Sequence, residues 1–193
     1  MQASNVNQVH GDFFQIQDCL ALQYETLDPN NAPSVADSDS ISLFSLLGEL
    51  QLLEHDSLPL LRQIGERDRA LMSYLKLLSK RVDLVARALG LQLAADMDTP
   101  VTVILSEGGI TFPAAEPLEI DEWITLRLLL PTPAGLNIVA QVADCAQTPS
   151  GDYLVQISFD HLNDAHRQLL ARHIIHKQAQ DIRAAKHNER TSL

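Results

Sequence analysis

Ser106, Gly108 and Gly109 are the residues of this chain whose types and spacing most suggest ligand chemistry. A serine hydroxyl beside two glycines can hold a ligand, because residues without Cβ let the backbone come close to it. The same hydroxyl could be a nucleophile, but no G-x-S-x-G elbow surrounds Ser106. Apolar residues alternate on both sides of this group, in VTVILSEGGITF over residues 101–112. The pattern predicts two short strands joined by a sharp corner at which both glycines can take positive φ.

The other candidate chemical groups do not compose an active site. His173 and His176 stand three residues apart, which can present two ligands to a metal, but no third ligand follows from spacing. We therefore expect no metal and no other cofactor, and we interpret these histidines as solvated or interfacial. Asp121 and Glu122 are typical of turn charges before a strand. No acid–base or nucleophilic constellation remains, so the sequence predicts a protein that is not an enzyme.

Length, charge and hydropathy restrict the class of protein. The chain has 193 residues, 46% of them hydrophobic, which suits one domain with an extension. Its net charge of −11 argues against non-specific binding to nucleic acid or to an anionic membrane. Residues 1–61 contain no Lys or Arg. The N-terminus lacks the features of a signal peptide, and no apolar run approaches the roughly 20 residues of a membrane helix. We expect a cytoplasmic protein without membrane insertion.

Hydrophobic periodicity divides the chain into six segments. Apolar residues with period two, separated by turn residues, predict a small antiparallel barrel. Period three to four predicts helices between the first strand and the rest, and again after the last strand. The expected segments are a flexible N-terminus over 1–11, the first barrel strand within 12–30, a linker over 31–41, a helical insertion with the oligomerisation helix over 42–90, the barrel over 91–160, and a C-terminal helix and tail over 161–193.

The helical segments carry their own start and stop signals. A short helix is predicted to end near residue 54, because His55-Asp56-Ser57 interrupts the pattern. Pro59 suits the first turn of a second helix that runs to Gly90. The C-terminal helix is predicted over 161–186 with a cap at Asn163 or Asp160. Its expected packing side consists of Leu169, Leu170, Ile174 and Ile175.

The second helix carries a heptad seam that indicates self-association. Its a and d positions are apolar except at Asp68, and Leu77 and Leu84 widen the apolar arc. An intramolecular hairpin is the alternative cover for this surface. The seam favours a homo-oligomer held by a parallel helical bundle, with a tetramer ahead of a dimer. The predicted oligomerisation residues are Leu61, Ile64, Leu71, Leu75, Leu78, Val82, Val85 and Leu89.

The corner and the order of the elements resemble a known family. Residues 104–109, ILSEGG, resemble the second signature of PilZ domains, bacterial receptor modules for cyclic di-GMP. The resemblance implies an α+β fold with a six-stranded antiparallel β-barrel, an inserted coiled-coil helix and a C-terminal helix. It also implies that Ser106, Gly108 and Gly109 are ligand-binding residues. The inserted heptad helix resembles that of an atypical PilZ subgroup that assembles into tetramers.

Two functions are compatible with this resemblance. The chain departs from the family at Ile104, where an Asp or Asn is usual, and no two arginines stand four residues apart. Without guanidinium groups the ligand phosphates would lose several charge-assisted hydrogen bonds worth about 1.5–3 kcal/mol each. The sequence therefore favours an oligomeric adaptor for a signalling protein, to which cyclic di-GMP is an unlikely ligand. The alternative is a cyclic di-GMP receptor with a degenerate site.

Overall fold

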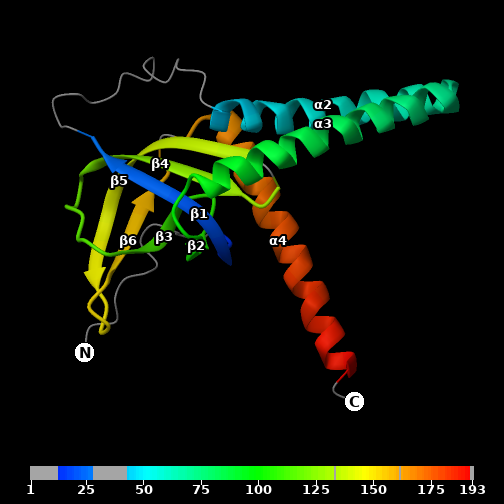
Figure 1. Ribbon diagram of the computed structural model, residues 1–193. Coiled ribbons are helices and arrows are strands. Elements are labelled where there is room, and N and C mark those ends of the chain that lie inside the picture. The colour runs from blue at the N-terminus through cyan, green and yellow to red at the C-terminus, as the bar shows by residue number, and fades with distance from the viewer. Residues whose placement is uncertain (1–12, 28–42, 133, 161, 192–193) are drawn as a thin grey trace.

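The computed structural model describes residues 13–27, 43–132, 134–160 and 162–191. The predicted flexible N-terminus, the predicted linker and the start of the helical insertion at residue 42 lie outside these ranges. Six strands and three helices follow one another along the described chain (Figure 1). The elements are β1 (Ile16–Thr26), α2 (Leu43–Arg67), α3 (Arg69–Ala95), β2 (Val101–Leu105), β3 (Gly109–Ala114), β4 (Trp123–Leu130), β5 (Ala134–Gln147), β6 (Tyr153–Ser158) and α4 (Asp164–Thr191).

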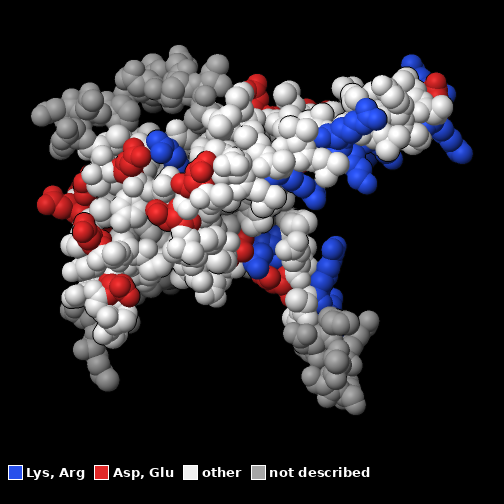
Figure 2. Space-filling view, viewed as in Figure 1, with Lys and Arg blue, Asp and Glu red and all other residues white. Residues whose placement is uncertain are grey.

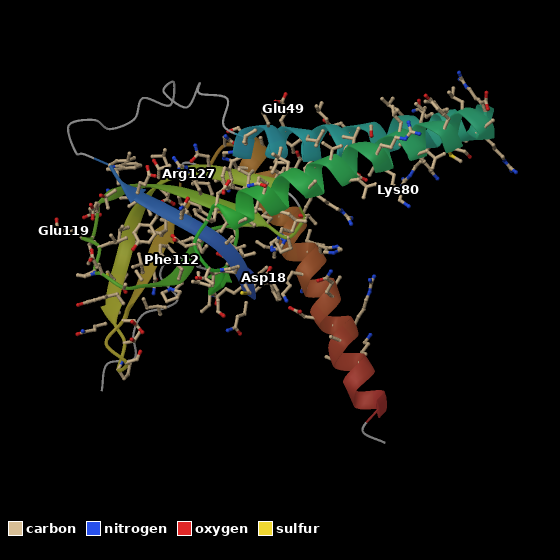
Figure 3. All side chains as sticks on the ribbon, viewed as in Figure 1. Asp18, Glu49, Lys80, Phe112, Glu119 and Arg127 are labelled. Atoms are coloured by element: carbon tan, nitrogen blue, oxygen red, sulfur yellow. The ribbon has the colours of Figure 1, made fainter. Side chains whose placement is uncertain are left out.

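The six strands close into an antiparallel barrel in the order β1-β2-β3-β6-β5-β4. Alternate residues of each strand point inward and form one core, which includes Leu20, Leu126 and Phe112. Figure 3 shows Phe112 inside the barrel, where its ring stacks at 5.4 Å from that of Tyr24. The predicted α+β fold with a six-stranded barrel is confirmed. Barrel closure leaves no free sheet edge, so the strands need no other chain to satisfy their backbone.

The inserted helices form a hairpin that projects from the barrel (Figure 1). The prediction of a break at His55-Asp56-Ser57 and of one helix from Pro59 to Gly90 is wrong. Pro59 lies inside α2, and the chain instead breaks at Asp68. The Asp68 carboxylate accepts a hydrogen bond from the backbone N–H of Leu71 at 2.9 Å and so caps α3. Asp68, the polar residue in the heptad seam, is therefore the point at which the two helices separate.

Close backbone contacts fix the base of the hairpin to the barrel. Ala21 of β1 pairs with Leu129 of β4, and both pack outward against Phe44 and Leu47 of α2. A Cβ at Gly135 of β5 would lie 2.6 Å from the Phe44 backbone, so only glycine allows this approach. Helix α3 joins the same cluster through Ala86 and Leu93 and runs past the predicted end at Gly90 to Ala95. Gly90 is buried, because it lies inside this contact rather than at a helix end.

Helix α4 packs against the barrel and is capped as predicted. The Asn163 side-chain oxygen accepts a hydrogen bond from the His166 N–H at 2.7 Å. Leu169, Leu170 and Ile174 are buried, as expected, whereas Ile175 is exposed and the expectation for it is wrong. The 100° turn from Ile174 to Ile175 carries Ile175 out of the packed arc.

No helix in the described ranges is long and apolar enough to cross a membrane.

Candidate functional site

The Ser106 corner between β2 and β3 is closed by its own hydrogen bonds. The Ser106 hydroxyl oxygen accepts from the backbone N–H groups of Gly108 and Gly109, each at 3.2 Å, and donates to the Gly109 carbonyl at 3.3 Å. The Ser106 N–H bonds the same carbonyl at 2.9 Å, and the Gly108 carbonyl accepts from the Phe159 N–H at 2.9 Å. Ser106 is fully buried. The structure thus brings the three predicted ligand-binding residues together, but their polar groups bond one another.

The backbone of this corner does not have positive φ. Among the described residues, positive φ occurs at Gly151 and at Asp121, and at neither Gly108 nor Gly109. The expectation of left-handed glycines here is therefore wrong. A serine side chain that bonds amides two and three residues ahead can close such a turn with ordinary backbone angles. The positive φ of Asp121 belongs to the turn before β4, where the sequence predicted turn charges.

The predicted heptad seam is divided between the two helices of the hairpin. Leu61 and Ile64 lie on α2, and the other six seam residues lie on α3. Leu61, Ile64, Leu75 and Leu89 are half-buried, whereas Leu71, Leu78, Val82 and Val85 are exposed. The intramolecular hairpin, considered as an alternative from the sequence, is therefore present and covers only part of the seam. Half of the seam remains available to another molecule.

Most of the exposed large apolar residues of the hairpin form two stripes, and Leu43 and Leu58 of α2 lie outside them. The α3 stripe includes Leu78 at 44% exposure, Val85 at 69%, Leu77 at 62% and Leu84 at 57%. Its full membership is Leu71, Tyr74, Leu77, Leu78, Val82, Leu84, Val85 and Leu91. The α2 stripe consists of Leu46, Leu53 and Leu60, at seven-residue spacing. Sequence reasoning missed the α2 stripe. The predicted break at His55 assigned Leu53 and Leu60 to different helices, so their seven-residue spacing was not considered.

Charge is distributed unevenly between the barrel and the hairpin. Figure 2 shows acidic side chains over the barrel and basic side chains along the outer part of the hairpin. Arg62, Arg67, Arg69 and Lys76 lie near the turn between the helices, and Lys80, labelled in Figure 3, lies further along α3. Seven of the 14 Lys and Arg residues lie on the two helices of the hairpin, six lie on α4, and Arg127 lies on β4. The corner itself carries Glu107 and lies beside Asp160, which accepts a hydrogen bond from Ser158 at 2.6 Å.

Comparison with known families gives one match, to the PilZ domain over residues 78–176. The matched residues make up more than half of the chain. They run from within α3, through the Ser106 corner, to α4. The chain belongs to the PilZ domain family. PilZ domains are non-enzymatic binding and adaptor modules of cyclic di-GMP-related signalling.

A solved PilZ structure has a similar fold and a helical bundle. It is a pathogenic protein from Xanthomonas campestris, described as a new tetrameric PilZ domain self-assembled via an unusual helical bundle. The two chains are 20% identical, with a TM-score of 0.58 and coverage of 91% of this chain and 94% of that one. This likeness shows the fold, and it fits the atypical PilZ subgroup indicated by the sequence. A comparison with curated proteins gave no significant match.

At the PilZ corner, this chain departs from the residues that are usual in the family. Ile104, which replaces the family's Asp or Asn, pairs with Gln17 of β1. The chain enters β1 through the exposed residues Phe13 and Phe14, and residues 1–61 contain no arginine. Lys177 of α4 comes close to β1, but its ammonium contacts the Asp18 and Asp181 carboxylates at 3.7 and 3.1 Å. The segment before β1 therefore does not supply the family's arginine pair.

A buried hydrogen bond joins α4 of the PilZ domain to β1. The His173 Nε2 atom lies 2.9 Å from the Asp18 carboxylate, and His173 is only 5% exposed. Figure 3 shows Asp18 on the side of the barrel that faces α4. Burial lowers the pKa of His173, and the nearby Asp18 carboxylate only partly offsets this effect. The predicted pair His173 and His176 is thus split between a buried structural role and an exposed one.

Two cavities flank α2 at the base of the hairpin. The larger, about 770 Å³, lies between the hairpin and the outer face of β1 and β4, and Ala21, Leu129 and Leu91 line it. The smaller, about 260 Å³, lies between α2 and α4. Neither cavity includes the Ser106 corner.

The described residues contain no group of three His, Cys, Asp or Glu side chains placed to hold a metal.

Proposed function

We propose that this chain is a non-enzymatic PilZ adaptor that self-associates through its helical hairpin and does not bind cyclic di-GMP with useful affinity. The observation that carries the proposal is the exposed α3 stripe. In this proposal the protein acts in the bacterial cytoplasm. It presents several barrels at once to a signalling protein, and the linked copies raise the effective concentration of the binding surfaces.

The size of the two stripes supports self-association. Burying one large aliphatic side chain is worth about 1.5–3 kcal/mol. The α3 stripe contains eight large side chains that are roughly half exposed, so two copies that cover each other's stripes gain on the order of 15 kcal/mol. Association of two proteins costs roughly 4–15 kcal/mol. Soluble monomers rarely leave so large an apolar surface in water.

The presence of two stripes on each hairpin supports a tetramer over a dimer. A hairpin with apolar surfaces on both helices can contact two neighbours. In a closed ring every copy makes the same two contacts. The similar Xanthomonas campestris PilZ protein is described as tetrameric through a helical bundle. We infer that Leu71, Leu78, Val82 and Val85 face neighbouring copies. Leu61, Ile64, Leu75 and Leu89 then hold each hairpin together and set the shape of that interface.

The internal bonding of the Ser106 corner supports the absence of nucleotide binding. A phosphate at this corner would compete with the Ser106 hydroxyl for the amides of Gly108 and Gly109. It would also lie near Glu107 and Asp160 without an arginine to offset their charge. The alternative function, a cyclic di-GMP receptor with a degenerate site, rests on family membership and on the retained Ser106, Gly108 and Gly109.

Calorimetric titration with cyclic di-GMP separates these two functions. The protein's mass should first be fixed by light scattering, so that the number of sites per assembly is known. We expect no saturable heat. A dissociation constant of about 10 μM or tighter, equivalent to roughly 7 kcal/mol of binding free energy, would require donors that the corner does not offer. That result would establish the receptor function instead.

A further inference from the structure

The smaller cavity at the base of the hairpin is lined by both apolar and polar side chains. It has a volume of about 260 Å³ and lies where α2, α4 and the turn after β4 meet. The polar side chains come from three segments that are distant in the sequence. They include Glu54, His55, Thr132, Arg172, His173 and His176. Ligand sites typically combine an apolar lining with a few polar groups that fix the ligand.

Two nitrogen atoms of this lining are buried without a hydrogen-bond partner. They are the Nη2 atom of Arg172 and the Nδ1 atom of His173. A buried polar atom without a partner costs about 1–3 kcal/mol, and the cost is higher for a charged group such as a guanidinium. Both atoms belong to adjacent residues of α4 that line the same cavity. One ligand could therefore satisfy both of them.

The hydrogen bond between His173 and Asp18 determines which ring nitrogen of His173 carries the hydrogen. Its Nε2 atom lies 2.9 Å from the Asp18 carboxylate, which can only accept a proton. The Nε2 atom therefore carries the hydrogen, and the Nδ1 atom of the neutral ring is an acceptor. The cavity thus offers a cationic donor, Arg172, next to an acceptor, His173. A suitable ligand must combine negatively charged oxygens with a hydroxyl group.

We propose that this cavity binds a phosphate group that retains a P–OH, as inorganic phosphate or as a phosphate monoester. The Arg172 guanidinium donates to the charged oxygens, as in other Arg–phosphate pairs. The P–OH group donates to His173 Nδ1. A phosphodiester has no P–OH group, so this site differs in chemistry from a site for cyclic di-GMP.

The other charged groups around the cavity favour a singly charged phosphate. Glu54 contributes a carboxylate, which disfavours a second negative charge on the ligand but accepts a hydrogen bond from a P–OH group. Burial and the nearby Asp83 raise the pKa of Glu54, and Arg87 partly offsets this effect. His55 and His176 add two imidazoles, and Lys177 lies one residue beyond His176 on α4 with its ammonium between Asp18 and Asp181.

A ligand in this cavity would join α2 to α4. The hairpin that carries the oligomer surface would then be tied to the helix that packs on the barrel. Because ligands stabilise the state that binds them, phosphate should raise the unfolding temperature. This inference does not depend on the proposed adaptor function, since the cavity shares no residue with the α3 stripe or with the Ser106 corner.

Calorimetric titration with inorganic phosphate tests this site. We expect saturable binding with a dissociation constant of about 1 mM or tighter, and at least tenfold weaker binding of sulfate, which has no hydroxyl at neutral pH. Parallel titration with O-phosphoserine distinguishes the source of the group, because its binding would identify a monoester ligand. If only inorganic phosphate binds, the free ion is the ligand. Absence of saturable phosphate binding, or equal binding of sulfate, would overturn the proposal.

Two arginine variants test whether phosphate binds in this cavity. Arg172→Gln should weaken phosphate binding at least tenfold, because it removes the guanidinium that faces the ligand. Arg183→Gln is the matched control, since Arg183 is exposed on the same helix outside the cavity. Circular dichroism checks that both variants are folded. Equal phosphate affinity of wild type and a folded Arg172→Gln protein would also overturn the proposal.

Discussion

The Ser106 corner and the helical hairpin differ in how far contacts within the chain satisfy their side chains. At the corner, the hydroxyl of Ser106 and the amides of Gly108 and Gly109 bond one another. On the hairpin, the two helices cover only part of each other and leave the α2 and α3 stripes exposed. In the proposed function, the corner therefore serves the fold, and the inserted helices provide the interaction surface.

The largest effect is expected from charges placed in the α3 stripe. Leu78→Asp combined with Val85→Asp should convert the assembly into monomers, because burying two carboxylates in an apolar interface costs several kcal/mol. Both residues are exposed within one hairpin, so the β signal in circular dichroism should persist. Light scattering measures the mass.

A matched control for this pair lies on another column of α3. Arg69→Gln combined with Lys76→Gln changes the net charge by the same amount at two exposed positions seven residues apart, outside the arc of the α3 stripe. We expect this protein to keep its assembly. Loss of assembly in the control, or its retention in the Leu78 and Val85 variant, would show that the α3 stripe is not the interface.

The next effect concerns the base that orients the hairpin. Gly135→Ala places a methyl group 2.6 Å from the Phe44 backbone, and a backbone atom cannot move aside as a side chain can. Overpacking of this kind typically costs about 1–3 kcal/mol. Gly65→Ala is the control, because its methyl group would meet only the flexible thioether of Met72. Urea unfolding should separate the two variants, and equal stabilities would contradict the proposed docking of α2.

A smaller loss is expected at the Ser106 corner. Ser106→Ala leaves two buried amides without their acceptor and should lower the free energy of unfolding by about 1–2 kcal/mol. Unchanged urea stability of Ser106→Ala would mean that the hydroxyl is not needed to hold the corner.

The smallest effect is a pH dependence of stability. The pKa of His173 is lowered in the folded state by burial, so below its ordinary value of 6.5 the unfolded chain binds more protons than the folded one. Stability is therefore fully present above about pH 6.5 and falls as the pH drops toward the folded pKa. His166 has the same sign for the same reason. His173→Gln should flatten this slope between pH 5 and 7 in thermal unfolding, and an unchanged slope would contradict the assignment.

The sequence predicted the barrel because each strand has one buried face. Period-two alternation over residues such as Leu20, Leu22 and Tyr24 is a direct consequence of that burial. It also placed the apolar seam residues in the helical insertion, but it assigned them to one helix, whereas the structure divides them between α2 and α3. It did not predict the hairpin turn, because Pro59 is a stronger local helix breaker than Asp68, whereas the structure keeps Pro59 inside α2 and breaks the chain at Asp68.

The candidate site was less predictable than the fold. The serine and glycines of the corner were found from their spacing, but their backbone angles and mutual bonds depend on where β3 and β6 pair. The contact between Asp18 and His173 joins residues 155 positions apart and has no local signal in either segment. The orphaned nitrogens of Arg172 and His173 could not be predicted either, because they arise from the packing of α4 against α2.

The central claim is that the hairpin assembles copies of this chain, and light scattering of the wild-type protein after size exclusion tests it most directly. The measurement should be repeated over a range of micromolar concentrations, because assembly follows mass action. The account predicts a tetramer, with a mass four times the 21.3 kDa of one chain. A mass of 21.3 kDa at micromolar concentration would contradict both the assembly and the multivalent adaptor built on it.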